Sequence, residues 1–219
     1  FTFAEKLYMG LANVERIFIA ELDPVYCVVA AVLVLLVYRK TGDYRKTLLA
    51  GIPALLLFGQ AVVRISHPSL KKVFVRPEQT THWDWHALVT YMPLVFLILS
   101  IFGILYALWQ LADGAWKHYL WTAFLLAGGF AIGVVMGFSP TIYASANRPY
   151  LYLYFVLIYV CADAVWNMGG MKAVWKIGSA DAVRKMPVPE KLMFTVLGLL
   201  VLANILDVTR MCWLLGRLL

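Results

Sequence analysis

The chain has few charged residues for its length. Of its 219 residues, 14% are charged and 63% are hydrophobic, whereas a soluble domain is about 25% charged and about half apolar. The mean hydropathy is +0.78. This shortage of charge excludes an ordinary soluble domain and predicts an integral membrane protein. At about 20 residues per span, the length allows about six transmembrane helices joined by short loops.

Cysteine is also scarce. Cys27, Cys161 and Cys212 all lie in apolar segments, and no two of them have the close spacing of a metal-ligand pair. We therefore expect no disulfide framework and no cysteine metal site, and we predict no cofactor.

The chain begins at Phe1 and shows no signal peptide, which would have a basic segment, a short apolar run and a cleavage site of small residues. We expect that either a leader has been removed or the chain is part of a longer one.

The charge that is present is mainly positive, with a net value of +7. No basic stripe lies on a soluble module, so we predict no nucleic-acid partner. Basic residues beside apolar spans instead set topology and contact anionic lipid. The basic loops 39–46 and 169–191 are predicted to be cytoplasmic, which places the 65–85 loop and residues 138–149 outside.

The pattern of apolar runs predicts an all-α, polytopic membrane protein in two parts. Residues 1–22 read as an amphipathic helix with an apolar stripe of Leu7, Leu11, Val14 and Phe18. We expect this helix to lie in the membrane interface, or alternatively to pack on the bundle. Residues 23–219 form a single transmembrane domain, with a kink expected at Gly51–Pro53 and close helix contacts along the glycines of the fourth span. The six predicted spans are 24–38, 47–65, 86–110, 118–138, 150–168 and 191–215.

A short polar insert, residues 138–150, separates the fourth and fifth spans and is the main functional clue. Pro140 should force Ser139 out of helical conformation and end the fourth span there. Arg148 comes just before the fifth helix, where a helix N-terminus and a guanidinium together favour a phosphate. We interpret the insert as a phosphate or pyrophosphate clamp on a lipid carrier or nucleotide product. The alternative is a topogenic arginine among ordinary capping residues.

The segment from Gly137 to Arg148, with its Ser-Pro-Thr run, resembles a segment found late in large bacterial membrane proteins of the GT-C superfamily, related to the O-antigen glucosyltransferases. The resemblance implies a polyprenyl-phosphate-linked sugar as donor and transfer outside the cytoplasm. It implies donor contacts for Ser139, Tyr143, Ser145 and Arg148, and we add Asn147 as a further candidate for substrate binding. It also implies a catalytic acid in an early loop. The early acids here are Glu5, Glu15, Glu21 and Asp23, none in a loop after a first span.

His82, Asp84 and His86 form a second candidate group. On a helix, His82 and His86 would share one face, and His67 could complete a zinc site. A histidine could also serve as an acid–base group. The alternative is a helix start in which Asp84 favours the N-terminal dipole and the neighbouring tryptophans anchor at the interface.

Polar residues inside the predicted spans form the third group. Asp163 and Asn167 are four residues apart, and Asp207 and Arg210 are three apart, so each pair shares a helix face. They indicate either a substrate or proton path or a structural pair near the interface.

Three functions stay open from these observations. The first is a protein of the bacterial inner (plasma) membrane that handles a polyprenyl-phosphate-linked sugar in cell-envelope glycan synthesis. If it is an enzyme, we expect a glycosyltransferase or a fragment of one. The second is a small transporter or channel that uses Asp163, Asp207 and Arg210. The third is a non-catalytic subunit that binds a partner membrane protein.

Overall fold

The computed structural model describes residues 2–66, 88–112, 114–139 and 150–168, and all regular structure in these ranges is helical. The predicted all-α class is therefore confirmed. The elements are α1 (Phe3–Glu15), the π-helix η1 (Arg16–Ala20), α2 (Pro24–Thr41), α3 (Tyr44–Ala50), α4 (Ile52–Ser66), α6 (Leu88–Leu111), α7 (Trp116–Val135), the 3-10 turn η3 (Met136–Phe138) and α8 (Leu151–Asn167).

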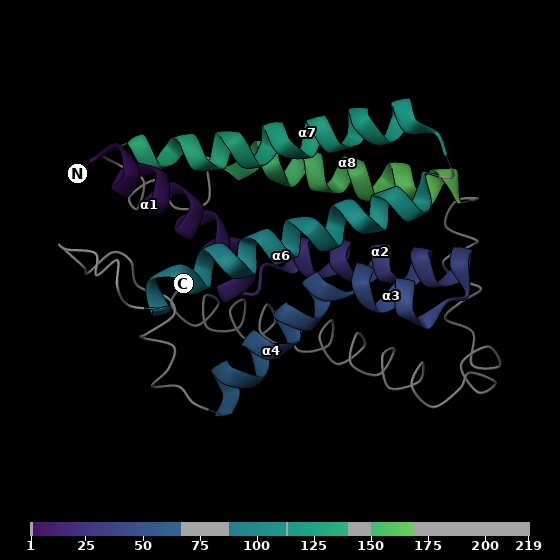
Figure 1. Ribbon diagram of the computed structural model, residues 1–219, viewed down its shortest axis with the longest axis horizontal. Helices are drawn as coiled ribbons and strands as arrows, with labels where there is room; N and C mark the ends of the chain where they lie inside the picture. Colours follow the sequence, from purple (N-terminus) through teal and green to yellow (C-terminus); the bar gives the residue numbers. More distant parts are fainter. Residues whose placement is uncertain (1, 67–87, 113, 140–149, 169–219) are drawn as a thin grey trace, which may run out of the picture.

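Several of these helices are long and apolar enough to cross a membrane. In the described part of the chain, α2, α6 and α7 each qualify, and the bent pair α3–α4 would make a fourth span. Helix α8 is apolar but shorter. The protein is thus membrane-embedded, and α2, α6, α7 and α8 run alongside one another in Figure 1. The sixth predicted span, 191–215, lies outside the described residues.

The predicted start of the first span and the predicted kink in the second both appear. Asp23 caps α2, because its Oδ1 accepts a hydrogen bond from the Tyr26 backbone N–H at 3.0 Å, and Pro24 suits the first helical turn. Helices α3 and α4 meet at Gly51 with a bend of 62°. Pro53 follows this bend and packs against Gly103 of α6.

Helix α1 packs against the bundle, where it contacts α6, α7 and η3 (Figure 1). Val14 and Phe18 of its predicted apolar stripe are buried, whereas Leu7 is exposed. The buried members of the stripe lie next to or within the π turn Arg16–Ala20, whereas Leu7 lies nearer the N-terminus. The alternative of a helix packed on the bundle describes this position, and the location of α1 in the interface stays a prediction.

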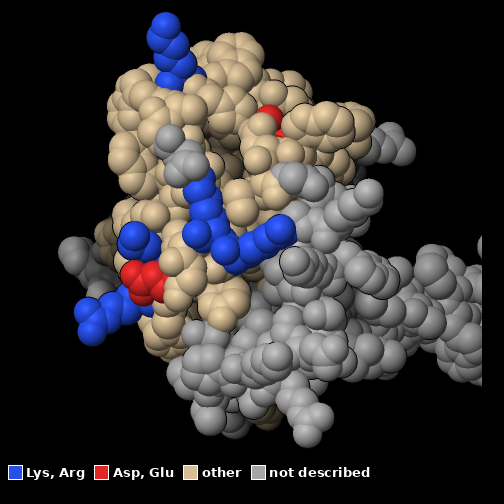
Figure 2. All heavy atoms as spheres, turned by 90° about the vertical axis from the view of Figure 1, so that its right-hand side faces the viewer, with Lys and Arg blue, Asp and Glu red and all other residues tan. Residues whose placement is uncertain are grey.

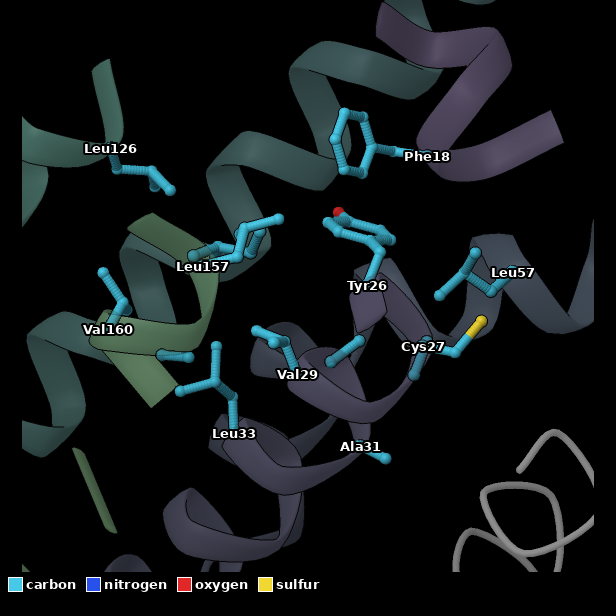
Figure 3. Packing of buried hydrophobic residues seen from close by; sticks show 14 of the residues in the cluster. Phe18, Tyr26, Cys27, Val29, Ala31, Leu33, Leu57, Leu126, Leu157 and Val160 are labelled. Atoms are coloured by element: carbon cyan, nitrogen blue, oxygen red, sulfur yellow. The ribbon is translucent and has the colours of Figure 1, made fainter. Parts of the chain in front are cut away.

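Helix α2 lies at the centre of the core. In Figure 3, Val29 and Leu33 lie toward Leu157 and Val160 of α8, while Cys27 lies toward Leu57 of α4. Gly129 and Gly133 of α7 make close helix contacts, as predicted, whereas Gly128 faces open space. A Cβ added at Gly133 would lie 2.8 Å from Val14 Cγ2 of α1.

Candidate functional site

The residues at the two ends of the polar insert, Phe138 and Tyr150, both contact side chains of α1. At the first end, Ser139 is extended (φ −84°, ψ 132°), as Pro140 predicted, and the ring of Phe138 lies 5.3 Å from that of Phe3. At the second end, the hydroxyl of buried Tyr150 accepts a hydrogen bond from the Asn13 side chain. We call this end of the bundle the insert end.

Two buried polar groups of α1 lie close to this end. Asn13 is fully buried, and its Oδ1 has no hydrogen-bond partner among the residues that the structure describes. Glu15 is 2% exposed, and burial raises the pKa of its carboxyl to about 8. A carboxyl with this pKa holds its proton at neutral pH. Sequence reasoning named Glu15 only as an early acid, because nothing in the local sequence shows that α1 is covered by α6 and α7.

A hydrogen-bonded pair joins the start of α2 to the first turn of α8 at the insert end. Tyr154 Oη donates to Asp23 Oδ2 at 2.7 Å. Burial raises the pKa of the Asp23 carboxyl, and the hydrogen bonds from Tyr154 and from the Tyr26 backbone oppose that rise. The pair offers both a carboxylate acceptor and a phenol to a ligand hydroxyl.

An apolar groove of about 780 Å³ runs between α2 and α8. It begins at Pro24, the residue after Asp23, and extends to Trp166 in the last turn of α8. Its walls are mainly β-branched side chains, among them Val25, Val28, Val29, Val32, Ile158 and Val165. An open apolar groove within the bilayer is filled by hydrocarbon.

The opposite end of the bundle is basic. It comprises the ends of α2, α6 and α8 and the beginnings of α3 and α7. Figure 2 views this basic end and shows Lys and Arg side chains gathered there, with few acidic ones among the described residues. The basic residues on these elements are Arg39, Lys40, Arg45, Lys46 and Lys117.

An acid–base pair lies at the basic end. His118 Nε2 of α7 is 2.7 Å from Asp163 Oδ2 of α8, and Asn167 Nδ2 is 3.4 Å from the same ring nitrogen. The structure thus brings Asp163 and Asn167 together, as the helical spacing predicted. Sequence reasoning missed His118, although its place at the start of a span beside Lys117 was a usable signal.

Most of the predicted site residues lie outside the part of the chain that the structure describes. Ser139 and Asp163 are described, but the remaining candidates lie outside the described residues. These are Tyr143, Ser145, Asn147 and Arg148 of the insert, the group His82, Asp84 and His86, and the pair Asp207 and Arg210. Their predicted roles stay predictions.

No protein-family model, curated protein or solved structure matches this chain.

Proposed function

We propose that this chain is a six-span protein of the bacterial inner membrane that handles a polyprenyl-phosphate-linked sugar in cell-envelope glycan synthesis. The observation that carries the proposal is the groove between α2 and α8, whose lining includes Pro24, the residue that follows Asp23 of the Asp23–Tyr154 hydrogen bond. A ligand that suits both features has a long hydrocarbon chain and a head rich in hydroxyl groups. A lipid-linked sugar has this composition.

The geometry of the insert end supports a headgroup site next to the groove. Helix α8 begins at Leu151, three residues after Arg148 in the sequence, and its N-cap residue Tyr150 makes no side-chain capping hydrogen bond within the described part of the chain. The free N–H groups of such a helix start and a guanidinium both bind phosphate oxygens. In the proposed arrangement Arg148 holds the phosphate, with Ser139, Tyr143, Ser145 and Asn147 as further contacts of the headgroup.

The charge distribution supports the proposed orientation. Basic side chains gather at one end of the bundle (Figure 2), whereas α1 and the stretch up to α2 carry the basic Lys6 and Arg16 together with the acids Glu5, Glu21 and Asp23. Under the positive-inside rule, the basic end faces the cytoplasm and the insert faces outward. Sugar transfer, if the protein carries it out, would then occur outside the cytoplasm.

Blocking the groove tests the proposal. Val28 lines the groove and is 49% exposed, so Val28→Trp fills the groove without disturbing the buried core. Val62 of α4 is 43% exposed and does not line the groove, so Val62→Trp is the matched control. The measured quantity is the dissociation constant of a long-chain polyprenyl phosphate for the full chain in detergent.

We expect saturable binding by the parent protein and the Val62→Trp variant, and at least about tenfold weaker binding by Val28→Trp, because filling the groove removes apolar contact area. Arg148→Ala should also weaken binding of the phosphate but not of the corresponding alcohol. The proposal fails if the parent protein shows no saturable binding or if Val28→Trp binds as the parent does.

A further inference from the structure

A small pocket at the basic end has no role in the proposed function. Asp163 and Asn167 of α8 and His118 of α7 form its polar side, and Leu111 and Tyr119 contribute to its apolar side. Its volume of about 20 Å³ is close to the space that one water molecule needs. The pocket therefore accepts a single small polar group.

The pocket lies at the depth of lipid headgroups. Tyr119, one of its walls, packs against two exposed tryptophans, with ring centroids 5.3 Å from Trp109 and 5.7 Å from Trp116. Such an aromatic cluster at the end of apolar helices occupies the membrane–water interface. A ligand that reaches the pocket from the membrane would present its headgroup there.

The charges at the pocket select the kind of headgroup. The ring of His118 is hydrogen-bonded to Oδ2 of the half-buried Asp163 carboxylate. Oδ1 of the same carboxylate can accept a hydrogen bond from a cationic N–H donor. At the edge of the pocket, Lys40 Nζ donates to the carbonyl of the lining residue Leu111 at 2.8 Å. The site thus pairs an anionic interior with a cationic rim.

We propose that this pocket binds the phosphoethanolamine headgroup of an aminophospholipid, with the ammonium at Asp163 and the phosphate at Lys40. An ammonium is about the size of a water molecule and has three N–H donors. A trimethylammonium group is too large for a pocket of about 20 Å³ and has no N–H to donate. An anionic headgroup without an amine leaves the Asp163 carboxylate without a cation.

The test is lipid competition on the full chain. The protein is equilibrated in detergent with equal amounts of phosphatidylethanolamine, its N,N-dimethyl derivative, phosphatidylcholine and phosphatidylglycerol, all with the same acyl chains. The lipids that remain bound are then quantified by mass spectrometry. We expect phosphatidylethanolamine to be enriched about fivefold over phosphatidylcholine, the factor for one net hydrogen bond, with the dimethyl lipid between them.

A pair of variants locates the effect. Asp163→Asn should bring the enrichment close to one, because the neutral amide no longer attracts an ammonium. Asp43→Asn removes the same charge at the basic end, and asparagine still caps α3, so we expect it to keep the enrichment. Equal retention of the ethanolamine and choline lipids by the parent protein overturns the proposal, as does preferential retention of phosphatidylglycerol. Unchanged enrichment in Asp163→Asn overturns it as well.

Discussion

The carboxyl of Glu15 gives the sharpest stability prediction. It is 2% exposed within the packed surface of α1, a helix that is not among the candidate membrane spans. Burial raises its pKa from 4.5 to about 8. Between these two values the folded protein keeps a proton that the unfolded chain has released, so the free energy of unfolding must fall as pH rises.

The size of the fall follows from the two pKa values. Each pH unit inside the window costs about 1.4 kcal/mol, so the loss is about 3 kcal/mol at pH 7 and between about 4 and 5 kcal/mol once the pH exceeds 8. Below pH 4.5 the stability is fully present. Glu15→Gln keeps the size and polarity of the protonated carboxyl but cannot ionise. The variant should therefore match the parent protein near pH 4.5 and exceed its stability by several kcal/mol at pH 8.5.

Unfolding in mixed micelles by titration with a denaturing detergent, at pH 5 and pH 8.5, measures this difference. Glu21→Gln is the control, since it removes the same group at an exposed position where the contact with Arg16 is long, at 3.8 Å. Its effect should stay below about 1 kcal/mol at both pH values. If the stability difference between Glu15→Gln and the parent is the same at both pH values, Glu15 is not protonated in the fold and the reasoning is wrong.

Three further changes test the packing. Gly133→Ala should lower the free energy of unfolding by about 1–3 kcal/mol, because the new Cβ meets Val14. In Gly128→Ala, on the same helix, the new Cβ enters open space, so the change should be neutral or stabilising by up to about 1 kcal/mol. Unfolding titrations of the two variants measure the difference. Tyr26→Phe and Ser100→Ala each break a buried hydroxyl pair and should each cost about 1–3 kcal/mol, with the double variant costing less than their sum. Asp23→Ala should lower the unfolding free energy by about 1–3 kcal/mol through loss of the cap and of the hydrogen bond from Tyr154, whereas Asp23→Asn retains the cap.

The sequence predicted the apolar helices well because each carries its own signals. Long apolar runs and nearby caps such as Asp23-Pro24 are local features, and the bend near Gly51 follows from glycine and proline close together. The π turn at Arg16–Ala20 has no such signature. It lies where the chain contacts α4 and α6, two helices that are distant from it in sequence.

The sites were harder to predict because they join distant segments. His118 and Asp163 are 45 residues apart on different helices, and a single sequence gives each helix face but not which faces meet. The groove between α2 and α8 depends on the spacing of two backbones, which no residue encodes alone. Asp163 and Asn167 were found because they share one helix face, and the polar insert was found because it interrupts two apolar runs.

The central claim, that the chain of a polyprenyl phosphate lies between α2 and α8, is tested most directly by photo-crosslinking. A polyprenyl phosphate with a diazirine in its chain is bound to the full protein and irradiated, and the labelled peptides are mapped by mass spectrometry. The account predicts labels concentrated on residues 25–32 and 158–166, which excess unlabelled lipid removes and Val28→Trp suppresses. Labels spread evenly over the exposed faces of α4, α6 and α7, or unaffected by Val28→Trp, would contradict it.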